Sequence, residues 1–130
     1  MEPSIFTKII KGEIPSHKIY EDDKTYAFLD IHPVQEGHVL VIPKSQVDKI
    51  YDLSDDDFMA LMKAAKKVAE RMQQVLNPPR VAWAVMGFDV PHAHIHLVPS
   101  AHGFKDLDPA LAAIEPNHAL LAEMAAKLAF

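Results

Sequence analysis

The sequence predicts a single α+β domain over residues 1–130, with a mostly antiparallel sheet of about five strands and two or three helices. Three observations support this fold class. Short segments rich in β-branched and aromatic residues alternate with turn signals. The connections between most of these segments are too short for the crossovers that parallel strands need. Longer segments carry apolar residues at helical spacing.

The N-terminal elements are a short helix and a β-hairpin. Apolar residues recur at helical spacing over residues 5–10, before Gly12 and Pro15 interrupt the pattern. Strand-forming residues then occupy Lys18–Glu21 and Thr25–Leu29, on either side of a polar turn. This arrangement is typical of two antiparallel strands that are adjacent in both sequence and space.

A buried strand and a long helix follow. Residues 38–42 are almost wholly apolar, which is typical of a central strand, and Pro43 ends the run. Ser54, with Asp57 three residues later, resembles a capping box, so we expect a helix to begin here. Apolar residues then repeat at helical spacing until Asn77 and the two prolines after it.

The C-terminal part of the chain supplies two more strands and a closing helix. Residues 80–86 and 92–98 are predicted to form a hairpin around Gly87. Beyond Pro99 the pattern weakens, and the closing helix is predicted from Leu120, Leu121, Met124 and Leu128.

Composition excludes several kinds of site and partner. The chain has no cysteine, which excludes disulfides, thiolate zinc sites and cysteine nucleophiles and is compatible with a reducing compartment. A formal net charge of -5 offers no general attraction to nucleic acid. No apolar run approaches the roughly 20 residues of a membrane span, and the N-terminus has no pattern of an export signal. We therefore expect a cytoplasmic protein that binds neither nucleic acid nor a membrane.

The stretch PHAHIHLVP places His92, His94 and His96 at alternate positions. In a strand these imidazoles share one face, about 6.5 to 7 Å apart, while the apolar residues between them face the core. They could be zinc ligands, which His38 could join from another strand. A neutral imidazole could instead act as a nucleophile in phosphoryl chemistry, assisted by its neighbours. A solvent-facing row of histidines without function is the third interpretation.

This stretch resembles the signature of the histidine triad (HIT) superfamily, in which three histidines alternate with apolar residues and two apolar residues follow. Residues 5–44, IFTKIIKGEIPSHKIYEDDKTYAFLDIHPVQEGHVLVIPK, are similar to the N-terminal half of the Hint-like branch of that superfamily. The resemblance covers most of the chain up to Pro99. It implies the HIT fold, whose usual form is a homodimer with the two sheets joined across the interface.

The resemblance implies a hydrolase or transferase that acts on a small-molecule nucleotide. Its substrate would be a nucleoside monophosphate, expected to be a purine nucleotide of AMP type, joined to an amine or another leaving group. His94 would be the nucleophile that forms a nucleotidyl-histidine, and His96 would contact the phosphate and assist the leaving group. His92 would orient His94, partly through its backbone carbonyl, and His38 would be the fourth histidine of the site. No metal or other cofactor is expected.

The resemblance also assigns residues to nucleotide binding. Asp30 matches the acid that holds the ribose hydroxyls, and a carboxylate can accept two hydrogen bonds from a diol. Six apolar residues match the base pocket, although core packing explains each of them at least equally well: Ile5, Phe6, Ile9, Phe28, Ile31 and Leu40.

Two departures from the family pattern stand out. Ser4, Thr7 and Gln46 occupy positions where many members carry a Cys-x-x-Cys pair and a histidine that bind structural zinc with the first triad histidine. Their replacement predicts that this zinc site is absent as a unit, which favours the nucleophile over the metal cage.

The second departure is the short loop MGFDVPH before the triad, where many members have a longer glycine-rich loop. Phe88 stands where a phosphate-contacting glutamine is expected, and Asp89 where a small polar residue is common. Asp89 could repel the phosphate, or point outward while its backbone amide donates to it. Two alternatives therefore stay open: a dinucleoside polyphosphate hydrolase, and a catalytically weak nucleotide-binding or protein-interaction module.

Overall fold

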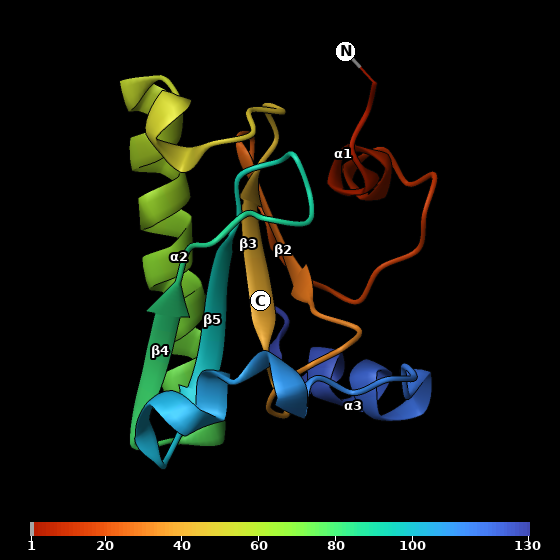
Figure 1. The fold of residues 1–130 in the computed structure, drawn as a ribbon, viewed down its shortest axis with the longest axis vertical. Coiled ribbons are helices and arrows are strands. Elements are labelled where there is room, and N and C mark those ends of the chain that lie inside the picture. The colour runs from red at the N-terminus through yellow and green to blue at the C-terminus, as the bar shows by residue number, and fades with distance from the viewer. Residues whose placement is uncertain (1) are drawn as a thin grey trace.

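The computed structural model describes residues 2–130 and confirms the α+β class with an antiparallel sheet (Figure 1). Short 3₁₀ turns lie between the larger elements. The described residues form three α-helices and five strands: α1 (Ile5–Ile10), β1 (Lys18–Glu21), β2 (Thr25–Leu29), β3 (Val39–Pro43), α2 (Asp55–Leu76), β4 (Arg80–Ala84), β5 (Ile95–Ser100) and α3 (His118–Leu128).

The sheet has the strand order β1-β2-β3-β5-β4, and every neighbouring pair is antiparallel. The chain leaves the centre of the sheet after β3, runs through α2 and returns at the edge as β4. Strand β5 then pairs on both sides, with β3 and with β4. In Figure 1, α2 lies along one side of the sheet and α1 lies on the other.

The central strands bury both of their faces. Val39 and Val41 of β3 join the core beneath α2, whereas Leu40 and Ile42 join a second cluster that includes Phe6 of α1. A strand covered on both faces reads as a continuous apolar run, which explains the pattern of residues 38–42. The candidate site lies on the α1 side of this sheet.

Helix α2 has the ends that the sequence predicts. The Ser54 side chain accepts a hydrogen bond from the backbone N–H of Asp57 at 3.2 Å, and acidic residues fill the first turn. Such residues suit the positive end of a helix dipole. Asn77 ends the helix in the left-handed conformation, with a φ of 49°.

The predicted strands of the last hairpin differ from the observed ones. The first ends at Ala84 instead of residue 86, and the second begins at Ile95, three residues later than predicted. The reason lies in the backbone hydrogen bonds of the triad. The N–H of Ala93 donates to the carbonyl of Val47 at 2.7 Å, so this stretch is bonded to the loop after β3 and not to a neighbouring strand.

The segment after Ser100 packs along the loop between β2 and β3 before the chain enters α3. The N–H of Ala113 donates to the carbonyl of Pro33 at 3.2 Å, and Gln35 Nε2 donates to the carbonyl of Asp106 at 3.2 Å. The chain ends beside β1, where the N–H of Phe130 donates to the carbonyl of Ile19 at 3.1 Å. This segment therefore supports the loop that follows β2.

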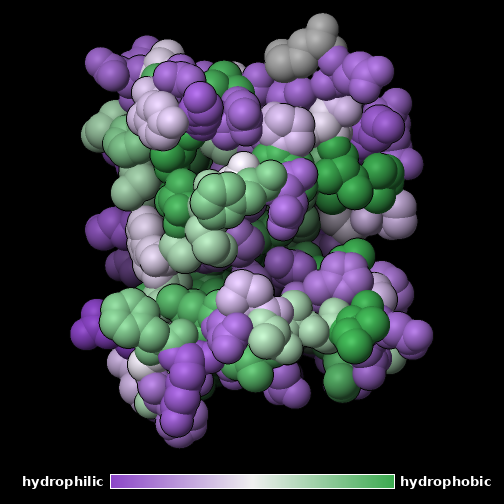
Figure 2. All heavy atoms as spheres, viewed as in Figure 1, coloured by the Kyte–Doolittle hydropathy of each residue, from purple (hydrophilic) through white to green (hydrophobic). Residues whose placement is uncertain are grey.

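The surface carries exposed apolar side chains as well as polar ones. Figure 2 shows them in several separate groups among polar residues on the face toward the viewer. Phe88, Phe104 and Ile114 are each more than 90% exposed. The homodimer that the family resemblance implies stays a prediction. No helix within residues 2–130 is long and apolar enough to cross a membrane.

Candidate active site

The triad lies where the chain enters β5, on the sheet face that carries α1. The residues between the histidines, Ala93 and Ile95, belong to the core beneath α2, as the alternation predicts. On the other face the ring of Phe6 lies edge-on to His92 and His94, at centroid distances of 5.8 and 5.1 Å. The ring of His96 follows at 5.0 Å from that of His94. The structure therefore brings the three imidazoles together.

His92 is fully buried, and both of its ring nitrogens have partners. Nε2 lies 2.7 Å from the carbonyl oxygen of Pro43, which can only accept, so Nε2 carries the proton. Nδ1 then accepts from the hydroxyl of Ser4 at 2.7 Å. Burial lowers the pKa of His92, with the Pro43 hydrogen bond opposing this and His94 adding to it. His92 is therefore neutral in a single tautomer.

Ser4, Thr7 and Gln46 lie together next to His92. The Oε1 atom of Gln46 accepts from the backbone N–H of Ser4 and from the hydroxyl of Thr7, both at 2.7 Å. Its Nε2 atom donates to the carbonyl of Glu2 at 2.8 Å. The sequence singled out these three positions only as replaced zinc ligands. In the structure they form a hydrogen-bonded cluster whose members satisfy one another.

His94 is buried and has one assigned ring hydrogen bond. Its Nδ1 lies 2.7 Å from the carbonyl oxygen of His92. Because a carbonyl can only accept, Nδ1 carries the proton of the neutral ring. The Nε2 atom is then left with its lone pair, which is the form in which an imidazole can attack an electrophile.

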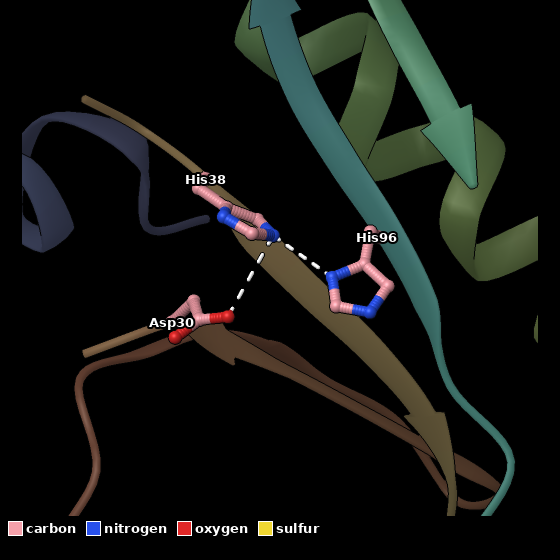
Figure 3. A group of neighbouring side chains, drawn as sticks. All are labelled: Asp30, His38 and His96. Atoms are coloured by element: carbon pink, nitrogen blue, oxygen red, sulfur yellow. Dashed lines mark hydrogen bonds and ion pairs between the residues drawn. The ribbon is translucent and has the colours of Figure 1, made fainter. Parts of the chain in front are cut away.

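His38 and His96 form a second hydrogen-bonded series beside Asp30 (Figure 3). The backbone N–H of Val34 donates to Nδ1 of His38 at 3.2 Å, so Nε2 of His38 carries the proton. That proton is directed to Nδ1 of His96 at 2.9 Å, and Asp30 Oδ2 lies 3.7 Å from the same His38 nitrogen. The Nε2 of His96 therefore carries a proton and is a hydrogen-bond donor.

The electrostatics of this series favour neutral rings. Burial lowers the pKa of His96 to about 4, with smaller contributions from His38 and His94 in the same direction and an opposing one from Asp30. Burial also lowers the pKa of His38, and Asp30 opposes that shift. Both rings are thus donors and acceptors of hydrogen bonds near neutral pH, without positive charge.

Asp30, His38 and His96 are also a group that could hold a metal ion, since one ligand atom of each lies within 4.8 Å of the others. The hydrogen bonds argue against this use. A metal at Nε2 of His38 would move the ring proton to Nδ1, where it would face the N–H of Val34. The donor set therefore fits a proton-sharing series better than a metal site.

Asp30 has one oxygen committed to the protein. Oδ1 accepts from the backbone N–H of His32 at 2.8 Å. The ring of His32 in turn reaches the carbonyl of Ala113 at 2.8 Å. Because Asp30 is half-buried and Oδ2 makes only the long contact with His38, this oxygen is available to a ligand hydroxyl.

The six residues expected to form a base pocket are not all together. Phe6, Ile9, Phe28 and Leu40 belong to the buried cluster beneath α1. Ile5 is 49% exposed and lies outside that cluster. Ile31 is 36% exposed and is likewise outside it.

The loop before the triad borders open space next to His94. A cavity of about 410 Å³ is lined by Tyr51, Met86, Phe88 and His94, among others. Phe88 is 91% exposed, and Asp89 is also exposed. The structure gives Asp89 no partner among the hydrogen bonds and ion pairs of residues 2–130, so its expected contact with a phosphate stays a prediction.

The family resemblance pointed to the His92 carbonyl as a group that orients His94, and the structure has that contact. Sequence reasoning missed three other groups that orient the histidines. Two of them are backbone groups, the carbonyl of Pro43 and the N–H of Val34, and backbone groups carry no sequence signal. The third is the hydroxyl of Ser4. Its sequence signal was its place in the replaced zinc positions.

Comparisons with known proteins agree with these observations. The profile of the HIT domain matches residues 11–103. An uncharacterized HIT-like protein of Methanocaldococcus jannaschii is 39% identical over 107 residues, which cover 76% of this chain and 80% of that protein. An adenosine 5'-monophosphoramidase of Candida albicans is 43% identical over 108 residues, which cover 73% of this chain and 68% of that protein.

A solved structure extends the similarity to nearly the whole chain. The crystal structure of a HIT-like protein from Bartonella henselae, described as involved in cell-cycle regulation, superposes with a TM-score of 0.85 at 31% identity. The match covers 96% of this chain and 92% of that one.

Proposed function

The chain belongs to the HIT domain family, and we propose that it is a nucleotide hydrolase that cleaves an AMP-type nucleoside monophosphate from an amine or another leaving group, through a covalent intermediate on His94. The observation that carries this proposal is the hydrogen bond from Nδ1 of His94 to the carbonyl of His92 at 2.7 Å. It leaves the lone pair on Nε2. The similarity to an adenosine 5'-monophosphoramidase supports the nucleotide and the amine.

In the first step, Nε2 of His94 forms a bond to the α-phosphorus while the bond from phosphorus to the leaving group breaks. The imidazole becomes positively charged as its lone pair is used. The carbonyl of His92 stabilises that charge because it already accepts the Nδ1 proton. The burial of His92 keeps this carbonyl in place.

His96 acts on the phosphate oxygens and on the leaving group. With a pKa of about 4 it is neutral in the free enzyme, and its Nε2–H can donate to a phosphate oxygen or to the leaving group. An anionic phosphate beside the ring favours its protonated form, so substrate binding raises the pKa of His96 and makes it an acid for the departing amine.

In the second step, water attacks the phosphorus of nucleotidyl-His94, and the bond from phosphorus to Nε2 breaks. His96 takes one proton from this water, which replaces the proton that it gave to the amine. The hydroxyl group of the water stays on the phosphorus, and the nucleoside monophosphate leaves. His94 is then neutral again, and His96 is protonated as it was in the substrate complex. When the product leaves, the pKa of His96 returns to about 4 and the ring releases the proton that substrate binding had added.

Asp30 and the apolar cluster beneath α1 would hold the nucleoside. The free Oδ2 of Asp30 can accept a hydrogen bond from a ribose hydroxyl. The ring of Phe6 lies 5.1 Å from that of His94, and Leu40 pairs with His96 in the sheet, so these buried side chains would form the floor of a base site next to the histidines.

The proposal is tested by incubating the protein with adenosine 5'-phosphoramidate and, in parallel, with a diadenosine polyphosphate. Replacement His94→Ala should lower kcat/KM by about a thousandfold or more, because the covalent route is lost. The matched control is His102→Ala, since this histidine is exposed and lies outside the triad.

Each result has a defined meaning. Equal turnover by wild type and His94→Ala would refute His94 as the nucleophile. Faster turnover of the diadenosine polyphosphate would show that the leaving group is a nucleotide and not an amine. Tight AMP binding without turnover of either compound would show a binding module.

A further inference from the structure

We propose that Ser4 is a positioning residue for the nucleophile: its hydroxyl holds the ring of His92, and through the carbonyl of His92 it sets the direction of the Nδ1–H of His94. This inference rests on the proposed role of His94. It adds a residue of α1's N-terminus to a site otherwise built from the central strands.

Two short hydrogen bonds link Ser4 to His94 by way of His92, and a third holds the ring of His92 from the other side. The Ser4 hydroxyl lies 2.7 Å from Nδ1 of His92, Nε2 of His92 lies 2.7 Å from the Pro43 carbonyl, and Nδ1 of His94 lies 2.7 Å from the His92 carbonyl. Ser4, His92 and His94 are all buried, so water does not compete for these groups. The ring of His92 is therefore held from both sides.

The roles of Ser4 and Pro43 are complementary. The Pro43 carbonyl accepts from Nε2 and fixes which nitrogen carries the proton. The Ser4 hydroxyl donates to the opposite nitrogen and prevents it from being left buried without a partner. Loss of the hydroxyl would leave Nδ1 with only the long contact to the Thr7 hydroxyl at 3.4 Å, and that hydroxyl already donates its proton to Gln46. The ring would then be held firmly at one nitrogen only, and the backbone of His92 would follow the ring.

Ser4 is itself held in place, so its hydroxyl proton has a defined direction. Its Oγ accepts from the backbone N–H of Thr7 at 3.0 Å as the N-cap of α1. Its own N–H donates to Gln46 Oε1 at 2.7 Å. The hydroxyl of Thr7 also lies within reach at 3.3 Å, but it is farther than Nδ1 of His92 and donates to Gln46.

The N-cap role must be separated from the positioning role. Ser4→Ala removes both. Ser4→Asp keeps a good N-cap, but its ionised carboxylate can only accept and would draw a proton onto Nδ1 of His92. Ser4→Thr keeps both the cap and the donor. Ser54→Ala is the matched control, because Ser54 caps α2 through the N–H of Asp57 and lies outside the triad.

Two measurements are made on each variant: the ring nitrogen signals of His92 and His94 by NMR without substrate, and kcat and KM with adenosine 5'-phosphoramidate across pH. We expect Ser4→Ala and Ser4→Asp to lower kcat about tenfold with little change in KM, and to alter the His92 and His94 signals. Ser4→Asp should in addition show His92 protonated on both nitrogens. Ser4→Thr should restore most of kcat, and Ser54→Ala should lose stability alone.

Unchanged kcat and unchanged ring signals in Ser4→Asp would overturn the inference, since that variant keeps the cap. Equal losses of kcat in Ser54→Ala and Ser4→Ala would also overturn it, because they would point to general destabilisation. Failure of the wild type to turn over the phosphoramidate would refute the proposed function alone. The ring signals would still decide whether Ser4 orients His92 and His94.

Discussion

His92 and His96 lie on either side of His94 and differ in almost every respect except residue type. His92 is fully buried, and both of its nitrogens are bonded to groups of the protein. His96 is only partly buried, with Nδ1 bonded to His38 and its Nε2–H without a protein partner among residues 2–130. His92 therefore has no nitrogen open to a ligand, whereas the Nε2–H of His96 is open to one, as the proposed mechanism requires.

This difference shows that alternation alone does not assign roles within the motif. Alternate positions place the rings on one face, but the partners of each ring decide its tautomer and its freedom. The ring of His92 is bonded to the Pro43 carbonyl and to the Ser4 hydroxyl. The ring of His96 is bonded to His38, whose Nε2 lies 3.7 Å from Oδ2 of Asp30.

The largest expected contrast is between the two alanine variants of these histidines. His92→Ala should lower the free energy of unfolding by about 3 kcal/mol, since it leaves a cavity and removes a hydrogen-bond partner from the buried Ser4 hydroxyl and from the Pro43 carbonyl, and it should lower activity as well. His96→Ala should lower kcat with a much smaller loss of stability. Urea unfolding and steady-state kinetics measure both, and equal stability losses would contradict the division of roles.

Acid should destabilise the protein through His96. In the folded state this ring binds a proton only near pH 4, whereas its ordinary pKa is 6.5. The unfolded chain therefore binds more protons between these values, and the free energy of unfolding falls as the pH is lowered from 6.5 to 4. Allowing for the partial exposure of the ring, its share is roughly 1 to 2 kcal/mol.

The lowered pKa values of His38 and His92 act in the same direction. The check is urea unfolding at several pH values for wild type and His96→Gln. The variant should show a shallower decline. A decline as steep as that of the wild type would mean that His96 does not titrate as described.

A variant of Asp30 tests the proposed contact with the ribose. Asp30→Asn should weaken binding of ribonucleotides about tenfold, since one charged acceptor is lost, while 2'-deoxy nucleotides lose less. Calorimetric titration with AMP and 2'-deoxy-AMP makes the comparison. Equal weakening of both would argue against a contact between Asp30 and the 2'-hydroxyl.

The smallest expected effect on stability is at the loop before the triad. Phe88→Ala should change the free energy of unfolding by less than about 0.5 kcal/mol, because the side chain is 91% exposed. Its effect should be on KM for substrates with different leaving groups, since Phe88 lines the cavity beside His94. A large loss of stability would show that this loop is packed more tightly than its exposure indicates.

Much of the fold followed from local sequence signals. The hairpin of β1 and β2 and the ends of α2 were predicted to the residue, because turn residues, Ser54 and Asn77 act on neighbouring backbone. The start of β5 was predicted three residues too early. There the backbone bonds to a loop far away in sequence, at Val47, and no local pattern indicates such a partner.

The sequence by itself determined the α+β class, the family and the sharing of one sheet face by three imidazoles, because periodicity and the histidine motif are local properties of the chain. Only the tertiary structure decided which nitrogen of His92 and of His38 carries a proton. That choice depends on Ser4, Val34 and Pro43, which lie 88, 4 and 49 residues away from the histidines they contact. Hydrogen bonds to buried rings are set by folding, and they distinguish the ring of His92, with both nitrogens bonded to the protein, from the rings of His94 and His96, each with one nitrogen open to a ligand.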